Sequence, residues 1–206
     1  MDFRLRIAAT LVFCLIAVSW GVRPAEAVEA GESHLGFQAG GVFLDGKLGD
    51  LLADDFGFGA TMAFGITDYL AVDVDFLYAE FESADEDQYG DLNYTQGTLG
   101  LGLRASITRG MFSPYATLSP VAAWMNFKSH YPSGNGYDDD ETDTHGFGGS
   151  GTLGLDLFVA DNVTFGLAGQ VMALSTDLDF ATGDDLDNEV TAYTAYSGLF
   201  RLTVIF

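Results

Sequence analysis

Five charged residues interrupt stretches of the sequence that otherwise alternate between apolar and small side chains. They are Asp73, Asp75, Arg104, Asp156 and Arg201. Charges that leave water together need partners of opposite sign, so one prediction is a buried cluster of salt bridges. The other prediction is a gate on a path for water or ions.

A run of acidic residues has the chemistry to bind a cation. The stretch "YDDDETDTH" contains Asp138, Asp139, Asp140, Glu141 and Asp143. Carboxylates this close would ligate Ca²⁺ or Mg²⁺ if the segment folded around the ion. Their spacing does not match a helix-loop-helix calcium site. We therefore favour a solvated acidic surface with no cofactor, and weak binding of Ca²⁺ or Mg²⁺ is the alternative.

A histidine lies close to two serines in "SHYPSGNG", where His130 follows Ser129 and precedes Ser133. A serine nucleophile needs a base within hydrogen-bond reach, and a third group must orient that base. The glycines and the proline around these residues predict a loop. We therefore name no catalytic residue and expect no enzyme.

The elements that must position these residues are strands, because apolar side chains recur at every second position. In "FGFGATMAFGIT", the large apolar residues share one face and the small residues share the other. Each of the eight segments is at least nine residues long, about the length of a tilted transmembrane strand. The segments cover residues 35–43, 56–67, 70–80, 95–107, 115–128, 146–159, 163–175 and 190–206.

The connections between these segments alternate strictly between short and long. The long ones are acidic and lie at 45–55, 81–93, 129–145 and 177–189. Outer-membrane barrels have short periplasmic turns and long extracellular loops. We therefore predict an all-β fold, a transmembrane antiparallel up-and-down β-barrel of eight strands with both termini in the periplasm. Its interior would be only just wide enough for side chains to fill, which favours the salt-bridge cluster over the gate.

The first 27 residues have the features of a cleaved secretory signal peptide. Arg4 and Arg6 precede an apolar run, and the segment ends in a small-x-small cleavage site at Ala25 to Ala27. The barrel would then occupy residues 28–206. The only cysteine, Cys14, lies in the signal, so the mature chain would have no disulfide. The net charge of −22 excludes nucleic acid as a partner, because phosphates would repel the chain.

The five strand charges also indicate which face of the barrel meets lipid. All five lie on the small, polar face of their segments. A lipid-facing Arg or Lys would cost about 2–4 kcal/mol at the membrane midplane. The apolar face should therefore point outward to lipid and the polar face inward.

The chain ends in "YSGLFRLTVIF", which alternates up to a terminal aromatic residue. The signal, the eight segments, the alternating connections and this ending resemble the small eight-stranded outer-membrane barrels of the OmpA/OmpX-like superfamily. The resemblance implies a bacterial outer-membrane location and a terminal pattern that the barrel-assembly machinery reads. The matching residues are Tyr196, Gly198, Phe200, Leu202, Val204 and Phe206. We expect no periplasmic domain, since none follows Phe206 in this sequence.

These features predict a structural or surface-interaction protein, a monomer that acts through acidic extracellular loops on cations, lipopolysaccharide or an external partner. The first alternative is a narrow channel or transporter for ions or small solutes, including apolar ones. The second alternative is an enzyme that modifies lipid A, because barrels of that class also carry histidine and serine. In the deacylases these two lie two residues apart on a strand near the chain end, a pattern that His130 does not match.

Overall fold

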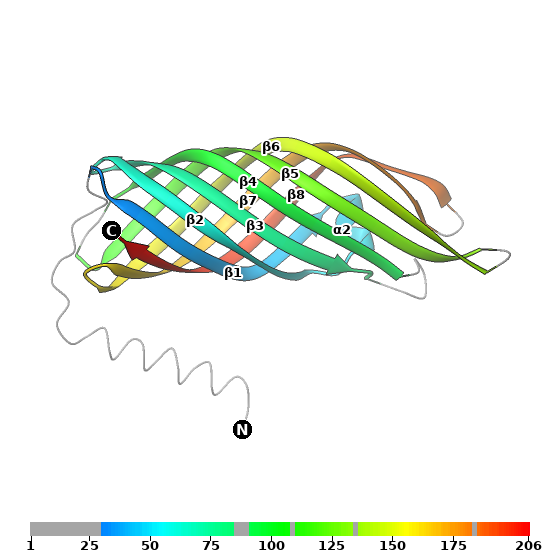
Figure 1. Cartoon of the computed structure of the whole chain (residues 1–206), viewed down its shortest axis with the longest axis horizontal. Coiled ribbons are helices and arrows are strands. Elements are labelled where there is room, and N and C mark those ends of the chain that lie inside the picture. The colour runs from blue at the N-terminus through cyan, green and yellow to red at the C-terminus, as the bar shows by residue number, and fades with distance from the viewer. Residues whose placement is uncertain (1–29, 85–90, 108–109, 134–135, 183–184) are drawn as a thin grey trace, which may run out of the picture.

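The protein is an antiparallel β-barrel closed by pairing of its first and last strands (Figure 1). The computed structural model describes the backbone of residues 30–84, 91–107, 110–133, 136–182 and 185–206, and their side chains except at 91, 130–140 and 177–189. Each strand pairs with its neighbour in sequence. The strands are β1 (Ser33–Asp45), β2 (Asp55–Thr67), β3 (Leu70–Glu82), β4 (Asp91–Ser106), β5 (Phe112–Ser133), β6 (Gly136–Ala160), β7 (Val163–Thr182) and β8 (Asp185–Ile205).

Strand alternation divides the side chains between an outer apolar face and an inner face. In β2, Phe58, Met62 and Phe64 are exposed, whereas Thr61 and Ala63 are buried. Large apolar residues are exposed on every strand, which is the reverse of a soluble barrel. The predicted facing of the strands is therefore confirmed.

The two ends of the barrel differ in how far the strands extend and in how they are connected. At the short-turn end, few residues join β2 to β3, β4 to β5 and β6 to β7. Ser33 and Phe206 also exchange backbone hydrogen bonds of 3.3 and 2.9 Å there. The opposite end holds the β1–β2, β3–β4, β5–β6 and β7–β8 connections, and we call it the hairpin end. There the paired strands β5–β6 and β7–β8 extend furthest (Figure 1).

The strands at the hairpin end are longer than predicted. The segments 129–145 and 177–189 were expected as loops, but pairing continues to Ser133 opposite Gly136 and to Thr182 opposite Asp185. Periodicity of apolar residues marks only the half-buried part of a strand. Backbone groups form the same ladder when both faces of a strand are polar, so the predicted strands were too short at this end.

The β1–β2 connection is the one predicted loop that contains a helix among the residues described. The short helix α2 (Lys47–Leu51) buries Leu48 and Leu51 in the mouth of the barrel. Gly46 begins it with a φ of 77°, which a residue with a side chain would rarely adopt. In the described part of the chain, no helix has the length and apolarity to cross a bilayer.

Candidate functional site

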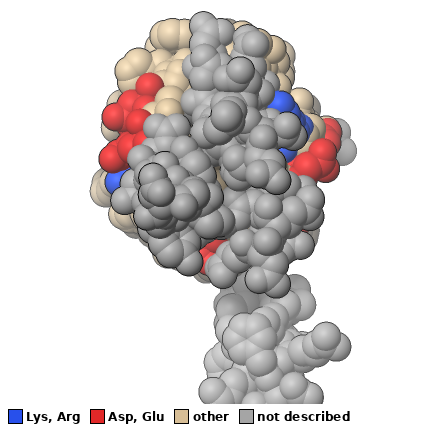
Figure 2. Space-filling view, turned by 90° about the vertical axis from the view of Figure 1, so that its right-hand side faces the viewer, with Lys and Arg blue, Asp and Glu red and all other residues tan. Residues whose placement is uncertain are grey.

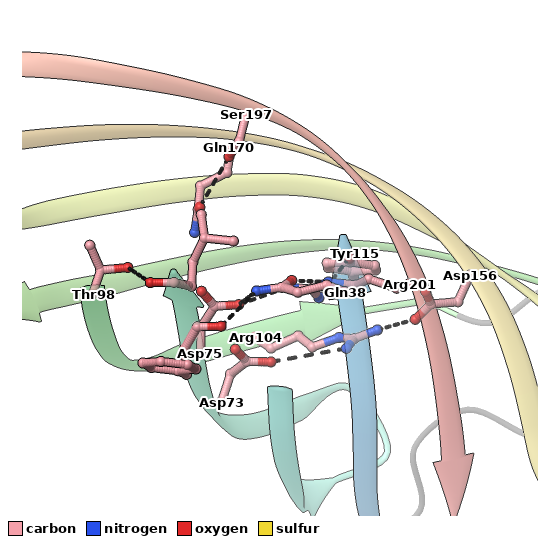
Figure 3. Close-up of polar contacts among 12 residues, drawn as sticks. Gln38, Asp73, Asp75, Thr98, Arg104, Tyr115, Asp156, Gln170, Ser197 and Arg201 are labelled. Carbon is pink, nitrogen blue, oxygen red and sulfur yellow. Dashed lines mark hydrogen bonds and ion pairs between the residues drawn. The ribbon is translucent and has the colours of Figure 1, made fainter. Parts of the chain in front are cut away.

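The inward-facing residues form a charged layer towards the short-turn end of the barrel. Strand alternation directs all five predicted charges into the lumen, and each residue is less than 10% exposed. Two further side chains, Gln38 and Tyr115, bind to them (Figure 3). We define the charged layer as Gln38, Asp73, Asp75, Arg104, Tyr115, Asp156 and Arg201.

Arg201 is the best-partnered member of the charged layer. Its Nη2 donates to Oδ2 of Asp75 at 3.0 Å, its Nη1 to the hydroxyl of Tyr115 at 2.8 Å, and its Nε to Oε1 of Gln38 at 3.0 Å. Gln38 also donates from Nε2 to the same Oδ2 of Asp75 at 2.8 Å. These contacts connect β1, β3, β5 and β8 across the lumen (Figure 3).

Arg104 holds two carboxylates with one guanidinium group. Its Nη2 donates to Oδ2 of Asp156, and its Nη1 lies 4.0 Å from Oδ2 of Asp73. The guanidinium carbon also lies 3.7 Å from the ring centroid of Tyr115, a cation–π contact. The charged layer therefore contains three carboxylates and two guanidinium groups, and Asp73 is the carboxylate with the longest ion pair.

A glycine makes room for Asp156. Gly166 on β7 pairs with Asp156 on β6. A Cβ at position 166 would lie 2.2 Å from Oδ1 of Asp156. A side chain there would require the Asp156 carboxylate to shift, so Gly166 leaves room for this carboxylate beside Arg104.

The lumen becomes apolar towards the hairpin end. The hydroxyl groups of Tyr94 and Tyr193 lie 3.0 Å apart, and the Tyr193 hydroxyl donates to Oε1 of Gln96 at 2.8 Å. Beyond this pair, buried apolar side chains form one connected cluster. We define the apolar layer as Leu48, Leu51, Leu52, Phe81, Leu92, Phe127, Leu174 and Val190.

The segment that carries α2 is fixed to the end of β3. The amide of Ala53 donates to the carbonyl of Glu82, and the amide of Ala84 to the carbonyl of Leu51, both at 2.9 Å. Leu48 itself is fully buried. The β1–β2 connection therefore folds over the apolar layer and closes it at the hairpin end.

Acidic side chains lie on the outside of the barrel at the hairpin end. Asn126 donates to Oε1 of Glu141 at 2.9 Å and to Oδ1 of Asp143 at 2.8 Å, and Nζ of Lys128 lies 3.0 Å from Oε1 of Glu141. The hydrogen bond from Asn126, followed by Lys128, lowers the pKa of Glu141 below its usual value. Figure 2 shows acidic side chains at separate places around this end.

The predicted cation site is only partly described. The side chains of Asp138, Asp139 and Asp140 lie outside the described residues. Within the described ones, no group of three or more His, Cys, Asp and Glu side chains is arranged to hold a metal ion. Glu141 and Asp143 instead bind Asn126.

Only one side chain of the serine and histidine candidates is described. Ser129 is buried on β5, whereas the side chains of His130 and Ser133 lie outside the described set. The backbone of His130 pairs with that of Asp139 in the β5–β6 ladder, where a loop was predicted.

The C-terminal pattern lies on the outside of β8. Phe200, Leu202 and Phe206 are exposed on the apolar face, as is Tyr196, and Gly198 shares that face. Val204 is half-buried beside Leu35 of β1. These six residues therefore lie on the outer face of the seam between β8 and β1.

Sequence reasoning missed Gln38 and Tyr115 because neither carries a charge. Gln38 does interrupt an apolar strand on the polar face, which is a usable signal. Tyr115 gives none, because tyrosine is common on both faces of such strands. Its role depends on the distance across the lumen to Arg201, which the pattern of a single strand does not contain.

The family model of the outer membrane protein beta-barrel domain matches residues 10–197. The chain belongs to this family. Its barrel therefore lies in the bacterial outer membrane, with the exposed apolar face in lipid. No curated protein sequence matches the chain significantly.

Solved outer-membrane proteins share the fold at low sequence identity. Neisserial surface protein A (NspA) is 13% identical with a TM-score of 0.58, over 84% of this chain and 98% of that one. The attachment invasion locus protein Ail of Yersinia pestis, in complex with the heparin analogue sucrose octasulfate, is 15% identical with a TM-score of 0.53, over 85% and 99%. OprG of Pseudomonas aeruginosa is 15% identical with a TM-score of 0.51, over 88% and 99%.

Proposed function

We propose that this barrel is a structural and surface-interaction protein of the outer membrane, a monomer whose lumen does not conduct solutes. The observation that carries the proposal is the set of side-chain contacts that cross the lumen. The charged layer bridges the barrel from wall to wall, and the apolar layer under α2 closes the hairpin end. An ion would have to break the salt bridges and then cross apolar side chains, which provide no ligands to replace its hydration shell.

The hairpin end is the extracellular end in this proposal. Short periplasmic turns and longer extracellular hairpins are the rule for outer-membrane barrels. Here the long β1–β2 and β3–β4 connections and the extended β5–β6 and β7–β8 strands all lie at this end. Both ends of the described chain would then lie in the periplasm. The outward aromatic residues of β8, ending at Phe206, would form the pattern that the barrel-assembly machinery reads.

The partner of the hairpin end is cationic in this proposal. The net charge is −22, and much of the acid lies in or beside the four connections at this end. Such a surface repels anions and attracts cations over about a Debye length, ~8 Å at physiological salt. A polyanion such as the sucrose octasulfate bound to Ail is therefore a poor partner unless Ca²⁺ or Mg²⁺ bridges it. The same bridging would connect the hairpins to phosphates of lipopolysaccharide.

Conductance in planar bilayers tests the closed lumen. We expect no defined channel openings from the wild-type protein. Steady openings that Arg104→Ala abolishes would overturn the proposal, because they would require a continuous path past the charged layer. Heat-modifiable migration on a denaturing gel confirms that each sample contains folded barrel.

A narrow channel is the second candidate, and α2 is the observation that favours it. A single short segment that begins at Gly46 covers the apolar layer. Its displacement would need to break the two backbone hydrogen bonds to the end of β3, and it would expose the hairpin end of the lumen. Replacing 47–51 with a glycine-serine linker tests this candidate. Openings in the linker variant alone would identify α2 as a gate, whereas silence in both proteins supports the closed lumen.

Measuring the mass of lipid A from cells that express the protein tests whether it is an enzyme. Expression in a host with defined lipid A should leave its mass unchanged. A mass change that His130→Ala removes would instead support an enzyme.

A further inference from the structure

A shallow groove crosses the outside of the barrel over β6, β7 and β8. It has a volume of about 400 Å³ and lies near the hairpin end. Its floor is Leu174 and Tyr193, and Phe147, which is 71% exposed, forms one wall. Elsewhere it is lined by short side chains or none: Gly148, Ala173, Ser175, Ala192 and Thr194.

The groove is continuous with the lipid-facing wall. Directly towards the short-turn end, the outward residues are large again, with Val171 and Tyr196 exposed. Towards the hairpin end, Ser175 precedes Asp177 by two residues, and Thr194 pairs with Asp45 of β1. The hollow therefore lies at the border between the apolar band and the acidic hairpin end, at the level of the leaflet on that side.

The chemistry of the lining suits a hydrocarbon chain. The Ser175 hydroxyl already donates to the carbonyl of Thr191 at 3.4 Å, so the groove presents little free hydrogen-bonding capacity. Phe147, Ala173 and Ala192 are exposed and supply apolar contact. A hollow that remains empty in a bilayer loses dispersion contacts with every atom that lines it.

The hollow also has a fixed shape. A Cβ added at Gly148 would lie 1.9 Å from the carbonyl oxygen of Ala173, which is backbone and has no room to move aside. The β6–β7 ladder thus requires glycine at one side of the groove.

We propose that this groove seats one acyl chain of a lipid in the leaflet at the hairpin end. The acyl chain lies along the outer wall, and the buried Leu174 and Tyr193 separate it from the lumen. The proposal does not depend on the surface role proposed above, because the groove is on the lipid-facing wall and the hairpins are beyond it.

Photolabelling tests the proposal directly. The wild-type protein is reconstituted in phosphatidylcholine–phosphatidylglycerol vesicles that contain a phosphatidylcholine with a diazirine in one acyl chain. After irradiation, labelled peptides are mapped by mass spectrometry. We expect labelling of 173–175 and 192–194 to exceed severalfold the labelling of outward positions on β5.

Two matched variants distinguish a seat from general lipid contact. Ala173→Phe fills the groove, whereas Ala116→Phe places the same ring on the exposed face of β5, outside it. Only Ala173→Phe should lower the groove labelling severalfold, and both proteins should keep their heat-modifiable gel shift. Uniform labelling of all strands, or groove labelling that Ala173→Phe leaves unchanged, would overturn the proposal.

Discussion

The two layers of the lumen differ in what their residues require of one another. In the charged layer, each guanidinium group needs particular oxygens at hydrogen-bond distance, as Arg201 has with Asp75 and Tyr115. In the apolar layer, Leu48, Phe81 and Phe127 need only to fill space without water. The charged layer therefore connects particular strands across the lumen, whereas the apolar layer covers the lumen at the hairpin end. Removing one side chain should therefore lower the free energy of unfolding more in the charged layer than in the apolar layer.

The largest expected effect is that of Arg104→Met, which tests this difference. The substitution removes the cation shared by Asp73 and Asp156 and leaves two buried carboxylates without it. Breaking a buried ion pair on one side costs about 3–5 kcal/mol. Urea unfolding in detergent micelles should show a decrease of that size in the free energy of unfolding.

A second substitution serves as the control for Arg104→Met. Adding Asp156→Leu to it should recover part of the lost stability, because one unpaired charge is then absent. A loss of less than ~1 kcal/mol in the single variant, the value of an exposed pair, would show that water reaches the cluster.

Leu48→Ala tests the apolar layer and should have the next largest effect. Leu to Ala in a core costs about 2–5 kcal/mol, and we expect the lower end because a short segment can open locally. Hydrogen exchange of the α2 amides should increase more than that of β3. Lys47→Ala is the matched control, since Lys47 is exposed on the same helix. Equal effects of both variants would mean that α2 does not close the lumen.

Tyr193→Phe tests the border between the two layers. It removes the hydroxyl that lies 3.0 Å from that of Tyr94 and donates to Gln96. We expect a loss of about 1 kcal/mol, the net value of one hydrogen bond, in the same urea experiment. A gain in stability would show that the lumen tolerates more apolar side chains at this level.

The smallest expected effect belongs to Glu141, the solvent-exposed counterpart of the lumen carboxylates. Because its pKa is lowered, its ionised form favours the folded state above its usual pKa of 4.5, and this contribution is lost as the pH falls. An NMR titration of the Glu141 carboxyl should show a midpoint below that value. Asn126→Ala should move the midpoint upward, and an unchanged midpoint would contradict the assigned cause.

The sequence predicted the charged layer better than the apolar layer. A charge such as Asp73 or Arg104 in an alternating strand is conspicuous, and its face follows from its neighbours. Phe81 and Leu92, by contrast, lie inside acidic segments that were expected as loops. Their burial depends on α2 folding back over the barrel, a long-range contact that local periodicity does not encode. The β5–β6 ladder beyond Lys128 was missed for the related reason that both of its faces are polar.

The exchange of hydrogen bonds between Ser33 and Phe206 has a consequence for biogenesis. Every other pairing in the barrel joins strands that follow each other in sequence, so those hairpins can form early. The seam between β1 and β8 joins the two ends of the chain and forms slowly because its contacts are non-local. Until then, two unpaired edges remain open to other strands and to aggregation. Inside the cell, the newly made chain must therefore be shielded throughout its passage to the membrane.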